Sequence, residues 1–229
     1  MLTWLPASPV NFPPIEQALE EPDGLLAAGG ALTPEWLLAA YARGIFPWYG
    51  EEQPILWWSP DPRLVLFPHE LKRSRSLAKR LRNGGFTVSF DQLFSEVMQQ
   101  CGDIRADKEG TWISEEMKEA YTRLHTLGYA HSVEVWQNNQ LVGGLYGIAL
   151  GRIFFGESMF SHVNDASKVA LVYLVEHLIS HNFVLIDCQV RTPHLTRLGA
   201  REIERQEFMR YLDQYAVIDL SPTHWANDQ

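Results

Sequence analysis

Two polar residues interrupt an apolar segment late in the chain, Leu185-Ile186-Asp187-Cys188-Gln189-Val190. In a β-strand, alternate side chains point to the same face, so Asp187 and Gln189 are predicted to share a face. Burying a carboxylate is costly unless its hydrogen bonds are satisfied. Two interpretations stay open: a structural aspartate bonded to a loop, or a functional polar group at a reaction site.

A second candidate is Glu157, in Phe154-Phe155-Gly156-Glu157-Ser158-Met159-Phe160. A carboxylate between aromatic residues and methionine is poorly placed for a solvated surface, so it should pair with a cation of the protein or of a substrate. We favour the substrate. The adjacent Gly156 suggests a bulge or a close backbone approach.

Other reactive side chains offer weaker patterns. Cys188 alternates away from Asp187 and has no nearby histidine, so we interpret it as a buried structural thiol. His177 and His181 are spaced like half of a zinc site, but no adjacent glutamate or third ligand accompanies them. With no phosphate-binding loop or dinucleotide fingerprint either, we expect no metal and no organic cofactor.

The charge of the chain is strongly polarised. The formal net charge is −9. One short segment nevertheless carries six basic residues and no acidic one: Lys72, Arg73, Arg75, Lys79, Arg80 and Arg82. This leaves −15 on the rest of the chain. The segment is either a solvated amphipathic helix or a surface for nucleic-acid phosphates, which dominate the affinity of such complexes.

Hydrophobic spacing and capping residues predict the elements that position these side chains. An N-terminal helix should begin at Thr33-Pro34 and end at Gly44, and the turn Ser59-Pro60-Asp61-Pro62 should separate a small domain, 1–62, from a larger one, 63–229. In the larger domain we expect helices over 72–83, 91–101, 114–128 and 165–180, strands over 86–90, 130–136, 140–149, 152–160 and 183–190, and two short C-terminal helices. Asp91, Ser114 and Asp165 are the predicted helix caps.

Three antiparallel strands, a helix and a further strand are the order of a GNAT-type acyltransferase core, so the predicted class is α+β. Enzymes of this type that use acetyl-CoA hold its pyrophosphate at a glycine-rich turn before the helix. Here the turn reads Ser161-His162-Val163-Asn164-Asp165-Ala166-Ser167-Lys168, with no glycine and with an aspartate at the helix start. Acyl-CoA is therefore disfavoured as the acyl carrier.

The composition is that of a globular protein: 229 residues, 46% hydrophobic and 21% charged. No apolar run has the roughly 20 residues of a membrane span, and no signal peptide is visible. The two cysteines form no disulfide framework. We expect a cytoplasmic protein with no membrane partner.

Several longer strings resemble one family, the bacterial leucyl/phenylalanyl-tRNA–protein transferases. They are Gly29-Gly30-Ala31-Leu32, Tyr41-Ala42-Arg43-Gly44-Ile45-Phe46-Pro47-Trp48, Trp57-Trp58-Ser59-Pro60-Asp61-Pro62-Arg63, Gly110-Thr111-Trp112-Ile113, His131-Ser132-Val133-Glu134-Val135-Trp136, Gly156-Glu157-Ser158-Met159-Phe160-Ser161 and Ile186-Asp187-Cys188-Gln189. The resemblance implies a small N-terminal α+β domain followed by a GNAT-like domain. It also implies transfer of Leu, Phe or Met from aminoacyl-tRNA to proteins that begin with Arg or Lys, which creates an N-end-rule degradation signal.

The resemblance further assigns roles to residues. Asp187 and Gln189 would act on the attacking amine and Glu157 would bind a substrate cation, although tRNA itself could assist proton transfer. The aminoacyl pocket would be lined by Leu145, Phe154, Met159, Leu171 and Ile186. Trp48, Tyr41 and Trp112 would stack on the terminal adenine, and the basic segment would hold the tRNA backbone. An acyl-CoA N-acyltransferase, or a non-enzymatic module that binds tRNA ends or basic N-termini, are the alternatives.

Overall fold

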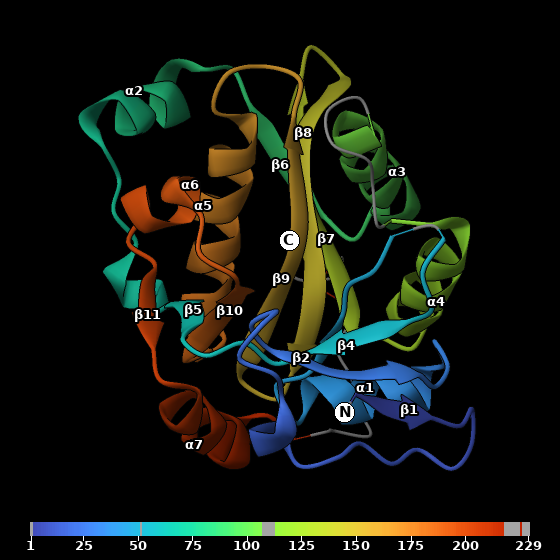
Figure 1. Ribbon diagram of the computed structural model, residues 1–229. Coiled ribbons are helices and arrows are strands. Elements are labelled where there is room, and N and C mark those ends of the chain that lie inside the picture. Colours follow the sequence, from blue (N-terminus) through green and yellow to red (C-terminus); the bar gives the residue numbers. More distant parts are fainter. Residues whose placement is uncertain (1, 51, 107–112, 218–224, 226–229) are drawn as a thin grey trace.

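The computed structural model describes residues 2–50, 52–106, 113–217 and 225, and it contains two β-sheets (Figure 1). A four-stranded sheet has the order β1-β2-β4-β3, and a seven-stranded sheet has the order β11-β5-β10-β9-β8-β7-β6. The chain leaves the first sheet at Trp58 and enters the second at Arg63.

The N-terminal sheet and one helix come from the first sixty residues. Their bounds are β1 Thr3–Leu5, the 3₁₀ helix η1 Ile15–Gln17, β2 Leu25–Gly29, α1 Pro34–Tyr41, β3 Phe46–Pro47 and β4 Leu56–Trp58. The Thr33 hydroxyl accepts a hydrogen bond from the Trp36 backbone N–H at 3.5 Å, so Thr33 caps α1 as predicted. After the helix, Gly44 has a φ of 68°, a backbone conformation that favours glycine.

The larger sheet follows the predicted element order. Its strands are β5 Arg63–Leu66, β6 Thr87–Phe90, β7 Ala130–Gln137, β8 Gln140–Leu150, β9 Ile153–Ser161, β10 Leu185–Gln189 and β11 Arg201–Ile203. Strands β7, β8 and β9 are antiparallel, and β10 lies parallel to β9 after a helical crossover. This order confirms the predicted α+β class with a GNAT-like arrangement. Two strands of this sheet, β5 and the short edge strand β11, are not among the predicted elements.

Helices cover both faces of this sheet (Figure 1). They are η2 Pro68–Glu70, α2 Arg75–Asn83, α3 Phe94–Ala106, α4 Glu115–Thr126, α5 Ala166–Ser180, α6 Pro193–Arg197 and α7 Arg205–Tyr215. The apolar side chains of α5 pack on one face, while α3 and α4 lie against the other. Within the described residues no helix is long and apolar enough to cross a membrane.

Asp91 and Asp165 do not make the predicted capping hydrogen bonds. Asp91 lies three residues before α3, and its carboxylate instead accepts hydrogen bonds from the His131 ring at 2.8 Å and the Ser132 backbone N–H at 2.9 Å. Asp165 directly precedes α5, as predicted, but its side chain pairs with Lys168 of that helix at 2.6 Å instead of capping it. In both cases another side chain takes the carboxylate, whereas Ser114 caps α4 as predicted.

Candidate functional site

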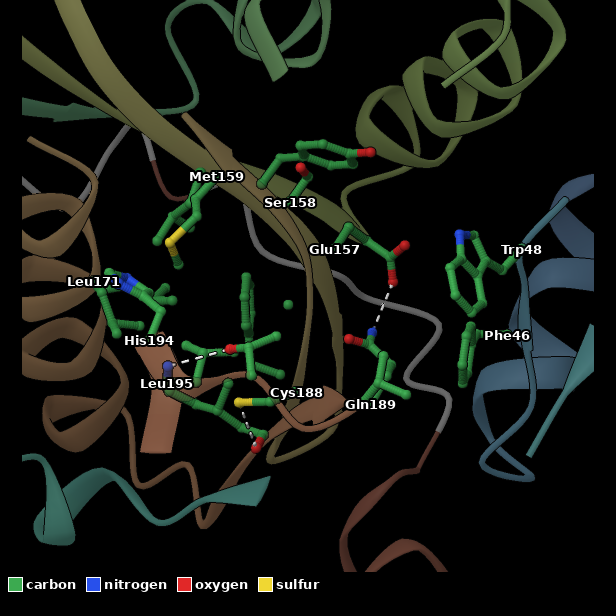
Figure 2. Close-up of a pocket in the computed structure, with 18 of the residues that line it drawn as sticks. Phe46, Trp48, Glu157, Ser158, Met159, Leu171, Cys188, Gln189, His194 and Leu195 are labelled. Atoms are coloured by element: carbon green, nitrogen blue, oxygen red, sulfur yellow. Dashed lines mark hydrogen bonds between the residues drawn. The ribbon is translucent and has the colours of Figure 1, made fainter. Parts of the chain in front are cut away.

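A cavity of about 450 Å³ opens where strands β9 and β10 separate (Figure 2). The two strands are paired only from Leu185–Asp187 on β10 to Ile153–Phe155 on β9. Beyond that point β9 stays with β8, and side chains from both strands line the space between them. Residues 46–48 of the N-terminal unit form a further wall, so both sheets contribute to one cavity.

The walls of the cavity are mainly apolar. All five residues predicted for an aminoacyl pocket line it: Leu145, Phe154, Met159, Leu171 and Ile186. Leu174, Cys188 and Leu195 extend the same surface. The Cys188 thiol is buried, and burial raises its pKa far above the ordinary value, so it is poorly suited to act as a nucleophile. The cavity has the shape and chemistry of a site for an apolar side chain.

Glu157 lies at the polar end of the cavity. The pairing of β8 with β9 shifts between Tyr146 and Gly147, and Glu157 is the extra residue of this bulge. Its carboxylate accepts hydrogen bonds from the Tyr41 hydroxyl at 2.7 Å and the Tyr121 hydroxyl at 3.3 Å, and the two tyrosines are hydrogen-bonded to each other. Burial raises the pKa of Glu157 to about 7, with the Tyr41 hydrogen bond opposing that effect.

Gln189 faces Glu157 across the gap between the strands (Figure 2). Its side-chain amide donates a hydrogen bond to the Glu157 carboxylate at 3.3 Å. The backbone of Gln189 has a φ of 56°, and the register of β10 against β5 shifts between Asp187 and Gln189. This irregularity ends the regular strand and places the Gln189 side chain at the cavity wall.

Asp187 has a different environment. It is fully buried and does not line the cavity, whereas Gln189 does. The two side chains, predicted to share one face of the strand, therefore do not line the cavity together. Both of its oxygens bond the Arg63 guanidinium, at 2.8 and 2.7 Å. Sequence reasoning missed Arg63. The signal was an arginine heading the apolar strand Arg63-Leu64-Val65-Leu66, together with a buried aspartate that needed a cation.

Of the three residues predicted to stack on adenine, two lie in the described part of the chain, and only one of them is accessible. Trp48 lines the mouth of the cavity and is 41% exposed, so part of its ring is accessible. Tyr41 is a correction: its ring is fully buried against Phe155, and its hydroxyl is used by Glu157. No face of Tyr41 is left for a base. Trp112 lies outside the described residues.

The basic segment forms a helix, as predicted, over the part that follows Ser74. The Ser74 hydroxyl caps α2 by accepting from the Leu77 N–H at 3.1 Å. Arg75, Lys79 and Arg82 are exposed, and their spacing places them on one helix face.

The other three basic residues are placed differently. Arg73 pairs with Glu176 at 2.8 Å, Arg80 lies over the Phe86 ring at 5.0 Å, and Lys72 is exposed before the helix. A basic face on α2 therefore remains accessible to a polyanion.

The strand order β7-β8-β9, α5 and β10, together with a cavity at the separation of β9 and β10, defines a GNAT-like acyltransferase fold. Among solved structures, FemX is similar with a TM-score of 0.47 and 12% identity, covering 66% of this chain and 64% of that one. An aminoglycoside acetyltransferase from an uncultured soil metagenomic sample has a TM-score of 0.41 and 17% identity, covering 52% of this chain and 93% of that one.

Comparison with known sequences narrows the class to one family. The family model of leucyl/phenylalanyl-tRNA protein transferase matches residues 65–213, and the model of its N-terminal domain matches residues 30–61. A leucyl/phenylalanyl-tRNA–protein transferase of Chromohalobacter salexigens is 64% identical over 98% of this chain and 88% of its own length. One from Aromatoleum aromaticum is 60% identical over 99% of this chain and 95% of its own length. The chain belongs to the leucyl/phenylalanyl-tRNA protein transferase family and is an aminoacyltransferase.

Proposed function

We propose that the protein moves Leu, Phe or Met from aminoacyl-tRNA to the α-amino group of proteins that begin with Arg or Lys. The product would be an N-end-rule degradation signal, made in the cytoplasm where charged tRNA is present. The observation that carries this proposal is the apolar cavity that opens beside the Gln189–Glu157 pair. It offers one wall for the amino-acid side chain and one polar edge for the reacting groups.

We propose that the cavity selects the amino acid by shape. Leu, Phe and Met are long, apolar and unbranched at Cβ, and the proposal requires that the entrance reject the branched Cβ of Val and Ile. Met159 gives one wall an adaptable side chain, which suits a pocket that accepts both Leu and Phe. Selection by pocket shape is typically worth about 1–3 kcal/mol per methylene group.

The chemistry requires orientation and removal of a proton. The amine nitrogen attacks the ester carbonyl, the new C–N bond forms, and the C–O bond to the 3′-oxygen of tRNA breaks. One proton leaves the nitrogen and the released 3′-hydroxyl gains one, so a group that accepts and returns a proton balances the step. Glu157, with its pKa raised to about 7, is matched to an α-amino group with a pKa near 7.7–8.0. Gln189 would orient the amine beside it.

Asp187 is assigned to the same step through Gln189. The backbone N–H of Gln189 donates to the Asp187 carboxylate at 2.9 Å, so Asp187 supports the residue that faces the amine. If tRNA itself carries the proton, Gln189 and Glu157 would only orient the amine, and the rate would show no titration near pH 7.

The remaining contacts would bind the two macromolecules. Arg75, Lys79 and Arg82 supply a basic face for the tRNA backbone, and Trp48, at the cavity wall, is proposed to stack on the terminal adenine. The same role is proposed from the family resemblance for Trp112, which lies outside the described residues. The formal charge of −15 outside the basic segment favours an acceptor with a cationic N-terminus. We assign residues 1–62 to a small domain that covers the cavity and residues 63–229 to the catalytic domain.

Transfer of label from radioactive Leu-tRNA tests the proposal. A peptide that begins with Arg is expected to become labelled, whereas the same peptide with an acetylated N-terminus is not. A matched peptide that begins with Glu tests the acceptor preference, and radiolabelled acetyl-CoA tests the alternative acyl carrier. Labelling from acetyl-CoA without tRNA would favour an acyl-CoA transferase, and tRNA binding with no labelled peptide would favour a binding module.

A further inference from the structure

Arg63 is the most deeply buried cation near the cavity. Its side chain is 1% exposed, and its guanidinium carbon lies 4.8 Å from the centre of the Phe46 ring and 4.8 Å from that of Phe208. Phe46 belongs to β3 and also lines the cavity, whereas Phe208 belongs to α7. Aromatic rings on two sides stabilise a desolvated guanidinium and restrict its position. The Arg63 guanidinium is therefore held between an aromatic ring of the N-terminal unit and one of the C-terminal helix α7.

The guanidinium in turn fixes Asp187. Nε and Nη2 of Arg63 donate to separate oxygens of the carboxylate at 2.8 and 2.7 Å, which is the two-point geometry that arginine forms with carboxylates. The same Oδ1 that accepts from Nε accepts the backbone N–H of Gln189 at 2.9 Å. Asp187 thus connects the buried cation to the backbone of the residue that reaches the cavity.

That backbone connection matters because Gln189 has a φ of 56°. Residues other than glycine rarely adopt the left-handed region and need their surroundings to hold them there. In this conformation the Gln189 side chain donates to Glu157 at 3.3 Å and lines the cavity.

We propose that Arg63 is a positioning residue for aminoacyl transfer: through Asp187 it holds the Gln189 backbone, and so aims the Gln189 amide at the attacking amine. The inference rests on the proposed role of Gln189.

Fold stability alone does not account for this arrangement. Replacing a buried ion pair by apolar residues of similar size is often neutral or stabilising, so packing by itself does not require Arg63 and Asp187. Lysine also cannot reproduce the interaction, because a single ammonium lacks the planar fork that reaches both oxygens. We predict that transfer needs the two-point geometry of the Arg63 guanidinium, and not only its positive charge.

The test is Arg63→Lys, with Arg201→Lys as the matched control. Arg201 also pairs with a carboxylate, Glu70 at 3.1 Å, and lies 4.4 Å from the Phe67 ring, but it is half-exposed on β11. We expect Arg63→Lys to lower kcat by about 10²-fold, since misplacement of a reacting geometry by about 1 Å costs that much. KM for Leu-tRNA should change by less than about twofold, and Arg201→Lys should match the wild type in both constants.

Hydrogen exchange of the Gln189 backbone amide provides a second measurement. A general loss of packing would not speed exchange at this amide alone. Faster exchange at Gln189 in Arg63→Lys, with α5 amides unchanged, supports the proposal. Wild-type kcat or wild-type protection of the Gln189 amide would overturn it.

If Arg63→Lys fails to fold, the double variant Arg63→Met/Asp187→Leu provides the test in its place. It is expected to fold and to bind Leu-tRNA normally, but to lose transfer and the hydrogen-exchange protection of the Gln189 amide. Retained transfer would overturn the proposal.

The variant Gln189→Ala tests the role of Gln189 separately from the role of Arg63. Full transfer in Gln189→Ala would refute the role proposed for Gln189, whereas loss there with normal Arg63→Lys would refute only the role of Arg63.

Discussion

The replacement Tyr41→Phe tests whether Glu157 is the group that accepts the amine proton. The change removes one hydroxyl and keeps the ring that packs edge-on against Phe155 at 5.1 Å. That hydroxyl donates the shortest of the hydrogen bonds to Glu157, at 2.7 Å, against 3.3 Å for each of Tyr121 and Gln189. A hydrogen bond to the ionised carboxylate lowers the pKa of Glu157, so its removal should raise that pKa further above its present value of about 7.

The size of the effect follows from the hydrogen bond that the substitution removes. A hydrogen bond to a charged group is worth about 1.5–3 kcal/mol, and one pKa unit corresponds to about 1.36 kcal/mol. The pKa of Glu157 should therefore move to about 8–9 in Tyr41→Phe. An acid is ionised above its pKa, so at pH 7 the ionised fraction falls from about one half to between about 1% and 10%. The rate at pH 7 should drop roughly 5- to 50-fold and recover as the pH rises toward 9.

Single-turnover transfer from Leu-tRNA, measured between pH 6 and pH 9, gives the profile directly. Short reaction times limit spontaneous hydrolysis of the ester. Tyr211→Phe is the control, because Tyr211 lies on α7 and packs against Phe67 instead of the site. If the profile of Tyr41→Phe superimposes on that of the wild type, Glu157 does not set the rate, and proton acceptance by Glu157 must be abandoned.

Three further variants test the pocket, the basic face and the C-terminal region. Met159→Ala should reduce Leu transfer relative to Phe by a factor that corresponds to about 1–3 kcal/mol, with uncharged-tRNA binding in a filter assay unchanged; an unaltered ratio would remove Met159 from the pocket. Changing Arg75, Lys79 and Arg82 to Gln should weaken tRNA binding and lower its salt slope by about 1 for each phosphate that is no longer neutralised; a wild-type slope would mark the face as solvated surface only. Trp225 is buried, 3% exposed, so Trp225→Ala should cost about 3–5 kcal/mol in the free energy of unfolding measured by denaturant; a decrease below about 1 kcal/mol would contradict that packing.

The order of elements could be predicted because its signals are local. Alternating side chains predict β7, β8 and β9 to within two residues, and Asn138 and Asn139, with φ of 52° and 60°, form the two-residue turn between β7 and β8. Thr33 and Ser114 are predictable as caps for the same reason. Asp91 carries the same kind of local signal, but a buried histidine on β7 uses its carboxylate instead.

The chemistry of the site depends on contacts that local patterns do not contain. Arg63 and Asp187 are 124 residues apart, and Tyr41 and Glu157 are 116 apart. The aromatic residues around Tyr41 suggest a stacking platform, but the helix that carries Tyr41 packs its ring into the core. Gly156 correctly indicates the bulge at Glu157, but the left-handed backbone at Gln189 escapes prediction, since it is imposed by the neighbouring strands.

The division of the chain near residue 62 marks a change of sheet, and the core continues across it. Buried Tyr41 and Phe46 from the N-terminal unit belong to the same apolar cluster as Tyr121 and Phe155 of the larger sheet. Tyr41 supplies the hydroxyl that opposes the rise in the Glu157 pKa, and Phe46 both lines the cavity and covers one side of the Arg63 guanidinium. Without the N-terminal unit the cavity would lose a wall, the carboxylate a hydrogen bond and the buried arginine a ring. The N-terminal unit therefore contributes directly to the site on the larger sheet. We expect the two parts of the chain to unfold together.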